Sequence, residues 1–345
     1  MVNNQSLNLK PHHPPKPKGK PMKRRDFFRT SLAAGAASGI LAASGAMAHA
    51  AEETKLPGDQ RDKAKFRIGS QLRGWIPGKN DAEKMAQIKK WGMEAVECWA
   101  GVVNNPKEFK KMADDAGLKV AVICGGTDAN ALSSPDPATR QKGIDSTKKS
   151  LEAAAILECN GIIYVPSFNN QYPYQNMTAT EIRKMLIETD PNTREVKSSL
   201  LKELGDFAAS LGTDIILEPL NRKEAWFLRM IADGASICRD TQSAGVKTMG
   251  DFYHMFYEET CNMGAFISGG KYVKHVHFGC GNARVLPGQA PEHGRDTFVS
   301  GFRGLKYIGY QGFMSFECGC LGGDEKGVEE VPKTLEFLRS CWEEA

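Results

Sequence analysis

Three features are missing from this 345-residue sequence, and each absence argues against a class of protein. The nine cysteines show no repeated spacing, which argues against a disulfide framework. No segment beyond residue 51 is apolar enough over about 20 residues to cross a membrane. The net charge of +4 comes from the N-terminus, because residues 1–50 carry eight of the 45 basic but one of the 41 acidic side chains. The remainder is slightly acidic, so we expect no nucleic acid as a partner.

The N-terminal segment has the composition of an export signal. Residues 23–30 read KRRDFFRT, and residues 31–51 contain no Asp, Glu, Lys or Arg. A charged start, a weakly apolar stretch and small residues at the cleavage point are typical of a signal peptide. The paired arginines followed by two phenylalanines resemble a twin-arginine signal, which implies the twin-arginine export machinery as a partner. We therefore expect a disordered extension and signal over 1–50, cleavage near 48–51, a linker over 51–64 and a periplasmic protein. An uncleaved membrane anchor is the alternative.

Short β-branched runs alternate with helical patterns through the rest of the chain, as in a parallel sheet built from βαβ units. Strands are predicted at 66–71, 95–99, 119–124, 161–165, 214–218, 246–251, 272–278 and 312–317. Helices are predicted at 82–91, 106–116, 137–158, 193–211, 225–240, 252–268, 298–308 and 328–343. Eight strands, each followed by a helix, predict an α/β fold with a single (β/α)₈ TIM barrel over 65–345. An open doubly wound sheet is the alternative, but residues 69–74 lack the glycine spacing of its phosphate loop.

Four consecutive strands in the second half each end on a carboxylate or an imidazole. The residues at these ends are Glu218, Asp251, His277 and Glu317. The carboxyl ends of the strands form the active-site face of such barrels, so we expect the four side chains to lie together. Each alone has a structural explanation; Asp251, for example, precedes a helix and can cap it. Together they predict a mixed oxygen and nitrogen site for one divalent ion: Mn²⁺, Mg²⁺, Co²⁺ or Zn²⁺.

The same segments carry a resemblance to a known family. EPLNRKE at 218–224, DFYH at 251–254, HVHFGCGNAR at 275–284 and SFE at 315–317 resemble motifs of the xylose isomerase-like sugar isomerase and epimerase superfamily. The likeness covers residues 65–343 and is greatest to the ketose 3-epimerase and hydroxypyruvate isomerase branch. It implies that Glu218 and Glu317 are catalytic. It also implies a set of metal ligands and a set of substrate contacts. The implied ligands are Glu218, Asp251, His277 and Glu317, and the implied substrate contacts are Glu224, His254 and Arg284.

The sequence departs from the family pattern after the H-x-H strand. Cys280 stands in a region where an acidic residue is common, and the loop over 285–295 is rearranged. Pro287, Gly288 and His293 are interpreted as remains of the usual motif, which makes His293 a further predicted substrate contact.

Two further features are expected near the site. The long segment 166–192, which follows the fourth strand and contains Phe168, Tyr172 and Tyr174, is either a lid or a surface excursion. Trp75 and Trp99, at the ends of the first two strands, form either an apolar wall for a sugar face or part of the core.

The predicted constellation suits proton transfer next to a carbonyl. A divalent ion stabilises the enediolate formed when the carbon-bound proton leaves, and two carboxylates divide the roles of base and acid. Return of the proton gives an epimer or an isomer, whereas loss of a β-substituent makes the enzyme a lyase or dehydratase on a keto-sugar or keto-glycoside. A non-catalytic sugar-binding barrel is a third reading, disfavoured because both glutamates are present. The expected partner is a small sugar, and a homo-oligomer is compatible with the sequence.

Overall fold

The computed structural model describes residues 58–345 except 133, 135, 167–177, 190–195, 199 and 226. The chain divides into two units, Met1–Thr54 and Lys55–Ala345, and all described residues belong to the second. The predicted export signal, its cleavage point and the first half of the linker, residues 51–57, therefore lie outside the described residues. Among the described residues, no helix combines the length and apolar character that a membrane crossing requires.

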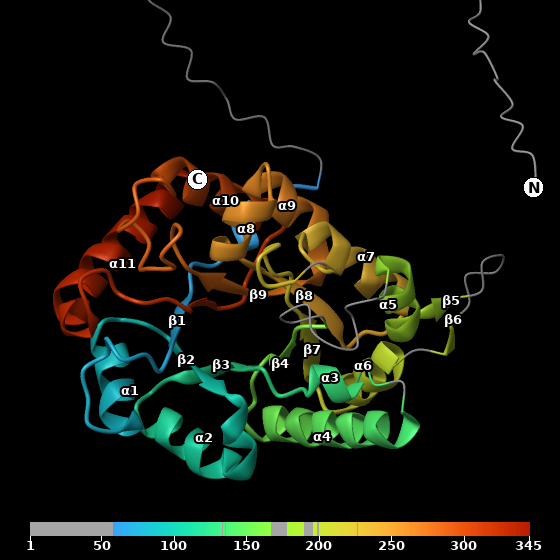
Figure 1. Ribbon diagram of the computed structural model, residues 1–345. Coiled ribbons are helices and arrows are strands. Elements are labelled where there is room, and N and C mark those ends of the chain that lie inside the picture. Colours follow the sequence, from blue (N-terminus) through green and yellow to red (C-terminus); the bar gives the residue numbers. More distant parts are fainter. Residues whose placement is uncertain are drawn as a thin grey trace, which may run out of the picture. The chain divides into compact units, whose positions relative to one another are not determined.

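Eight parallel strands close into a barrel, as the sequence predicts (Figure 1). Around the barrel the order is β1-β10-β9-β8-β7-β4-β3-β2, so neighbours in space are also successive in the chain. The strands are β1 (Ile68–Gln71), β2 (Ala95–Trp99), β3 (Lys119–Cys124), β4 (Gly161–Tyr164), β7 (Asp214–Leu217), β8 (Val246–Asp251), β9 (Val273–Phe278) and β10 (Met314–Phe316). The (β/α)₈ prediction is confirmed, and the open sheet is excluded.

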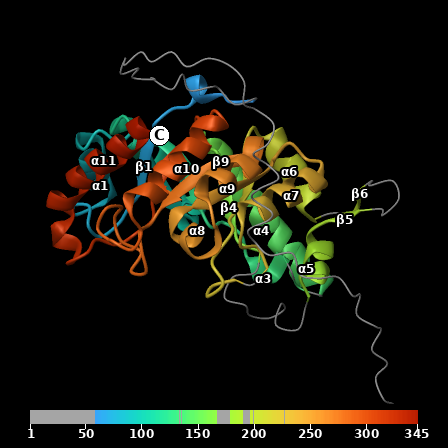
Figure 2. The same cartoon turned by 90° about the horizontal axis from the view of Figure 1, so that it is seen from above.

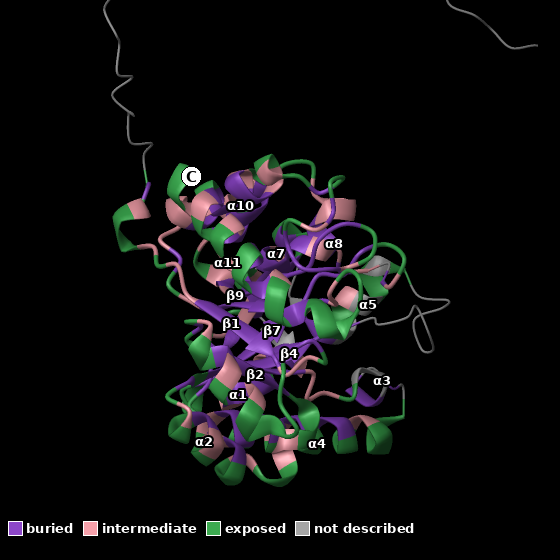
Figure 3. Ribbon diagram, turned by 90° about the vertical axis from the view of Figure 1, so that its left-hand side faces the viewer, coloured by how far each residue is buried: buried purple, intermediate pink, exposed green. Residues whose placement is uncertain are grey.

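Helices surround the strands on the outside of the barrel, as Figures 1 and 2 show from two directions. They are α1 (Asp81–Lys90), α2 (Pro106–Asp115), α3 (Ala129–Leu132), α4 (Pro137–Ile156), α5 (Ala179–Leu186), α6 (Leu200–Ser210), α7 (Ile231–Thr241), α8 (Phe252–Glu258), α9 (Asn262–Gly269), α10 (Arg295–Tyr307) and α11 (Gly327–Glu344). Short 3₁₀ turns lie at Arg61–Lys63, Ala100–Asn104, Gly270–Tyr272 and Asp324–Lys326. Figure 3 shows that the strands are buried while the helices expose their outer faces, as expected for a parallel sheet covered by helices.

The structure divides one of the predicted helices into two and begins two others later, since α6 starts at Leu200 and α7 at Ile231. The helix predicted over 252–268 is two helices, α8 and α9, because the chain is extended at Glu259 and restarts at Cys261. The sulfur of Cys261 caps α9 by accepting a hydrogen bond from the backbone N–H of Gly264 at 3.4 Å.

The segment predicted as one long loop after β4 is not loop throughout. It contains α5, which begins with a capping box between Thr178 and Glu181, and the strand β5 (Glu188–Thr189). β5 pairs antiparallel with β6 (Val196–Ser198). The proposed lid aromatics Phe168, Tyr172 and Tyr174 lie outside the described residues.

A cluster of phenylalanines packs between α10 and the strands that carry the second half of the predicted site. Phe252 stacks on Phe298 with ring centroids 4.9 Å apart, and Phe278 contacts both Phe302 and Phe316 at about 6 Å. All five rings are fully buried. Because each aromatic buries a large apolar area, this cluster gives β8, β9 and β10 a rigid support beneath their polar ends.

Candidate active site

The four predicted ligand residues meet at the carboxyl ends of neighbouring strands. Glu218 follows β7, Asp251 ends β8, His277 lies in β9, and Glu317 follows β10. One possible ligand atom from each of the four lies within 4.8 Å of the others. Glu218, Asp251 and His277 are buried, and Glu317 is nearly so. The order of strands in the barrel thus brings together side chains as far apart in the chain as residues 218 and 317.

Two buried atoms of this group indicate that the residues fit a cation. Oε1 of Glu218 and Nδ1 of His277 are buried and make no hydrogen bond within the described part of the chain. Nδ1 of His277 lies 3.6 Å from that oxygen and 2.7 Å from Oε2 of Glu317. Buried polar atoms that make no hydrogen bond are costly unless a charge such as a cation compensates them. Carboxylate oxygens and an imidazole nitrogen around one point are ligands that Mn²⁺, Co²⁺ and Zn²⁺ accept, and the oxygens also suit Mg²⁺.

Asp251 has two structural roles. Its Oδ1 caps α8 by accepting a hydrogen bond from the backbone N–H of Tyr253 at 2.8 Å. Its Oδ2 accepts a hydrogen bond from Nη2 of Arg284 at 2.7 Å. The capping role considered from the sequence is therefore present, and it leaves the second oxygen directed into the site.

Arg284 contacts two of the four ligand residues. Its Nη2 also donates to Oε2 of Glu317 at 2.6 Å, and its guanidinium lies 4.7 Å from the ring centroid of Tyr253. The residue adopts a left-handed backbone conformation, φ 49°, in the tight turn that follows β9. This turn aims the side chain back across the carboxyl ends of the strands.

The two proposed catalytic carboxyls occupy different electrostatic environments. Burial raises the pKa of Glu218, and the neighbouring Glu317 adds to that effect. Burial would also raise the pKa of Glu317, but His277 and Arg284 outweigh it and lower that pKa to about 2. Glu317 is thus held ionised, whereas Glu218 takes up a proton more readily. Carboxyl pairs whose pKa values are pushed apart are typical of acid and base partners.

Glu224 and His254 are oriented by one asparagine that the sequence analysis did not single out. The backbone N–H of Asn221 donates to Nδ1 of His254 at 3.1 Å, and its side-chain amide donates to Oε1 of Glu224 at 2.9 Å. With Nδ1 accepting, the proton of the neutral ring is on Nε2, which lies 3.5 Å from Asp251 and 3.9 Å from Glu218. Asn221 lies within the EPLNRKE segment, so the motif itself carried the signal.

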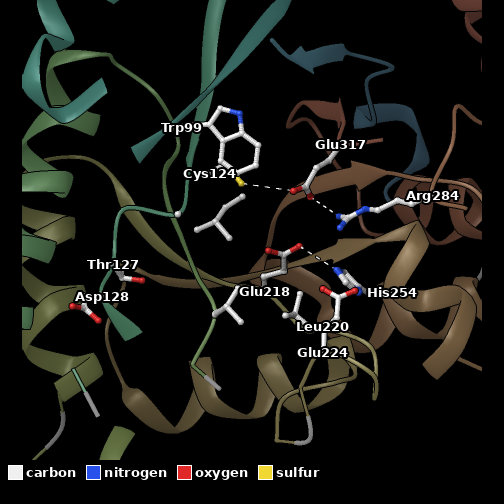
Figure 4. Close-up of a pocket in the computed structure, with 13 residues that line it drawn as sticks. Trp99, Cys124, Thr127, Asp128, Glu218, Leu220, Glu224, His254, Arg284 and Glu317 are labelled. Carbon is white, nitrogen blue, oxygen red and sulfur yellow. Dashed lines mark hydrogen bonds and ion pairs between the residues drawn. The ribbon is translucent and has the colours of Figure 1, made fainter. Parts of the chain in front are cut away.

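A cavity of about 620 Å³ opens above this group. In Figure 4 the side chains of Glu218, His254 and Glu317 lie close together, Trp99 lies above Cys124, and Thr127 and Asp128 lie apart from them at the left. Trp99 is 48% exposed, whereas Trp75 is 1% exposed and donates its indole N–H to the carbonyl of Cys318. Trp99 therefore lines the cavity, as one of the two sequence readings predicted, and Trp75 belongs to the core. The full lining is Trp99, Cys124, Gly125, Thr127, Asp128, Ile163, Val165, Glu218, Leu220, Glu224, His254, Arg284 and Glu317.

His293 is not brought to the cavity. Its ring lies between Phe256 and Phe298, with centroids 4.8 and 4.9 Å away, and it is 1% exposed. Its Nδ1 accepts a hydrogen bond from the backbone N–H of Gly281 at 3.1 Å. Burial lowers the pKa of His293 to about 4, so the ring is neutral. In this position it supports the turn that precedes Arg284 and does not reach the described cavity surface.

Glu97 in β2 is a buried acid that the sequence analysis did not single out. Its side chain reaches the H-x-H strand, where Nε2 of His275 and Nε2 of His277 are 2.9 and 3.0 Å from its carboxylate. Its signal in the sequence is a single charged residue inside the apolar run AVECW. Such a residue is expensive to bury without hydrogen-bond partners.

Comparison with known proteins places the chain in a family. Residues 85–341 match the model of the xylose isomerase-like TIM barrel, and the chain belongs to this family. It is 29% identical over 277 residues to 3-dehydro-D-guloside 4-epimerase of Escherichia coli (strain K12), covering 80% of this chain and 100% of the relative. It is 26% identical over 271 residues to D-psicose 3-epimerase of Agrobacterium fabrum, covering 74% of this chain and 89% of the relative.

Solved structures show the same architecture. The structure of 3-keto-D-glucoside 4-epimerase from E. coli superposes with a TM-score of 0.67 at 28% identity, over 80% of this chain and 100% of that one. D-psicose 3-epimerase of Clostridium cellulolyticum, solved with D-tagatose, also gives a TM-score of 0.67, over 80% of this chain and 99% of that one. At 22% identity this second likeness shows the fold alone. The curated relatives named here are sugar epimerases, which agrees with the isomerase or epimerase expected from the sequence.

Proposed function

We propose that the protein is a metal-dependent sugar epimerase or isomerase that moves a proton between carbon and two glutamates. The observation that carries this proposal is the meeting of Glu218 and Glu317, which line the cavity, with Asp251 and His277. The family and the epimerase activities for which the relatives are named support the same class of reaction.

The two glutamates divide the proton transfer. They follow β7 and β10, which are separated in the barrel by β8 and β9, so their carboxyls approach a sugar from two sides. One removes the proton next to the carbonyl as general base, and the other returns a proton as general acid. When bound, a divalent cation supplies positive charge at the substrate oxygens on which negative charge develops in the enediolate. The residues that would hold it are Glu218, Asp251, His277 and Glu317.

His254, Glu224 and Arg284 hold the substrate in this proposal. All three line the cavity beside the glutamates. The N–H on Nε2 of His254 and the guanidinium of Arg284 donate to sugar oxygens, and the carboxylate of Glu224 accepts from a sugar hydroxyl. Such contacts fix which carbon lies between the two glutamates, and so determine which sugar is accepted.

A lyase or dehydratase on a keto-sugar or keto-glycoside is the second candidate. It uses the same enediolate and differs only in the loss of a β-substituent. The size of the cavity and the exposed Trp99 favour a substrate larger than a free sugar, as does the glycoside in the names given to the similar E. coli 4-epimerase. An exported enzyme would meet such glycosides. We therefore also propose export through the twin-arginine route, with cleavage near residues 48–51.

Solvent exchange tests the proposal directly. The Mn²⁺-loaded protein is incubated in D₂O with a panel of ketoses and 3-keto-glycosides, and the products are followed by NMR. We expect deuterium at the carbon beside the carbonyl together with an epimeric product. An eliminated product would favour the lyase. No deuterium in any sugar, with metal bound, would overturn the enediolate mechanism and leave the sugar-binding barrel.

A further inference from the structure

Glu97 is a fully buried carboxylate that receives N–H donors from three side chains. Its Oε1 lies 3.0 Å from Nε2 of His277 and accepts a hydrogen bond from the amide of Gln71 at 2.7 Å. Its Oε2 lies 2.9 Å from Nε2 of His275. The carboxylate is therefore fully buried and held by neighbours on both oxygens.

The contact with Glu97 determines which nitrogen His277 turns toward the candidate metal ligands. A histidine has two ring nitrogens, and the one that donates to a carboxylate carries the proton. Nε2 of His277 lies against Glu97, so Nδ1 is left facing Glu218 and Glu317. Within the described part of the chain Nδ1 makes no hydrogen bond, and its nearest carboxylate oxygen is Oε2 of Glu317 at 2.7 Å. In metalloproteins an outer carboxylate that accepts from a ligand histidine fixes the ring and raises its basicity.

The other neighbours of Glu97 hold its carboxylate in place. The rings of His275 and His277 lie edge to face, with centroids 4.9 Å apart and planes at 89°. Gln71 is itself fixed, because Nη1 of Arg73 donates to its side-chain oxygen at 3.1 Å. The network connects β1, β2 and β9, and its members Gln71, Glu97 and His275 are fully buried. This arrangement gives His275, the first histidine of the H-x-H strand, a role outside the group of four ligand residues.

We propose that Glu97 is a positioning residue, which holds Nδ1 of His277 toward the point shared by Glu218, Asp251 and Glu317. The proposal rests on the proposed function in one respect, since it takes that point to be the metal site. Glu97 does not touch substrate in this proposal, because it acts through His277.

A second reading of the same atoms is a separate metal site. Glu97, His275 and His277 also offer three ligand atoms within 4.8 Å of one another. Three observations favour the positioning role. Both nitrogens already lie at hydrogen-bond distance from the carboxylate. The amide of Gln71 covers Oε1. All three residues have no exposed surface.

Titration of the metal-free protein with Mn²⁺ by calorimetry separates these readings. Glu97→Gln keeps the side-chain volume but replaces one acceptor oxygen by an amide. We expect one Mn²⁺ per wild-type chain and an affinity about 10- to 100-fold weaker in Glu97→Gln. Glu94→Gln is the matched control, because Glu94 lies just before β2 on the surface, where it pairs with Arg67. It should bind Mn²⁺ as the wild type does.

A second measurement reports the ring itself. Long-range ¹H–¹⁵N NMR of the Zn²⁺-loaded protein should show the proton of His277 on Nε2, and Glu97→Asp, which retains the carboxylate, should restore part of the lost affinity. Wild-type affinity in Glu97→Gln would overturn the proposal, as would two ions per wild-type chain with one lost in the variant. Absence of any Mn²⁺ binding by the wild type would overturn it too. Neither measurement uses a sugar, so the two proposals can fail separately. If Glu97→Gln binds Mn²⁺ more weakly but the wild type exchanges no deuterium into any sugar, the positioning role stands and only the proposed reaction is overturned.

Discussion

Arg284 donates a hydrogen bond from Nη2 to Oε2 of Glu317 at 2.6 Å, and the same nitrogen reaches Asp251. A residue proposed as a substrate contact is therefore also the cation beside a proposed catalytic base. Together with His277 it outweighs burial and lowers the pKa of Glu317 to about 2. Substrate binding and the ionisation of the base are thus linked through one guanidinium.

This link predicts a change in pH dependence. In Arg284→Gln the neighbouring positive charge is lost, and an opposite charge at this range changes a carboxyl pKa by about 1–3 units. The pKa of Glu317 then rises. Because the base must be ionised to act, activity is lost earlier as the pH is lowered. We expect the acidic limb of kcat/KM to move upward by about one pH unit or more. Arg284→Lys retains a charge and should move the limb less, while losing kcat/KM because it cannot reproduce the planar contact. An unchanged limb in Arg284→Gln would contradict the link.

The acid and base roles predict the effect of removing either carboxylate. Glu218→Gln and Glu317→Gln keep the side-chain shape and one oxygen but remove the proton-transferring group. Solvent deuterium exchange at the substrate carbon should fall by about 10²–10⁴-fold in each.

Variants of the substrate contacts are the comparison for these two. Glu224→Gln and His254→Asn should mainly raise KM, with a smaller effect on exchange at saturation. Undiminished exchange in both Glu218→Gln and Glu317→Gln, with metal still bound, would assign the chemistry to other residues.

The two roles of Asp251 predict that metal binding and stability separate. Asn is as good a helix cap as Asp, so Asp251→Asn should keep the bond to Tyr253 and lose Mn²⁺ affinity. Asp251→Ala loses the cap as well, which typically costs about 1 kcal/mol. Urea unfolding in the presence of EDTA measures the loss of stability, and calorimetry measures the loss of Mn²⁺ affinity. Equal losses of stability in both variants would show that the cap contributes nothing.

The polar residues at the strand ends were predictable because the local sequence shows a charged residue directly after a run of apolar ones. Glu218 and Glu317 each close a run of apolar residues, and parallel strands of a closed barrel bring such ends to one face. No knowledge of side-chain geometry was needed to expect Glu218, Asp251, His277 and Glu317 together. The bond between Arg284 and Glu317 was not predictable, because it depends on the left-handed turn at φ 49°.

Contacts between strands that are not neighbours were also beyond the sequence. Glu97 and His277 are 180 residues apart, and β1 and β10 lie between their strands, so the two side chains meet only because the sheet closes into a barrel. The prediction of one helix over 252–268 was wrong for a local reason. The aromatic and apolar pattern from Phe252 to Ser268 continues across the extended residues at which α8 ends, so the period alone gave one helix where the structure has two.

The buried ring of His293 predicts a loss of stability in mild acid. Burial lowers its pKa to about 4, below the unfolded value near 6.5, so the unfolded chain binds a proton first as the pH falls. The stability that the neutral ring of His293 contributes is therefore fully present above about pH 6.5 and is lost as the pH falls toward 4. From pH 7.5 to 5 we expect a loss of about 2 kcal/mol from this residue. His293→Asn keeps an acceptor near Gly281 but does not titrate. The difference in unfolding free energy between the wild type and His293→Asn should therefore narrow as the pH falls from 7.5 to 5. Parallel curves of unfolding free energy against pH would contradict the prediction.

The exposed indole of Trp99 predicts a preference for larger glycosides. Trp99 lines the cavity above Cys124 (Figure 4), and an aromatic face there stabilises a second ring or a bulky aglycone by about 1 kcal/mol. Trp99→Ala should lower kcat/KM about fivefold more for a keto-glycoside with an aromatic or sugar aglycone than for its methyl counterpart. Leu321→Ala is the control, since Leu321 is also exposed but does not line the cavity. Equal losses for both substrates would mean that Trp99 contacts the reacting sugar. No loss for either would leave the outer part of the cavity without a role in recognition.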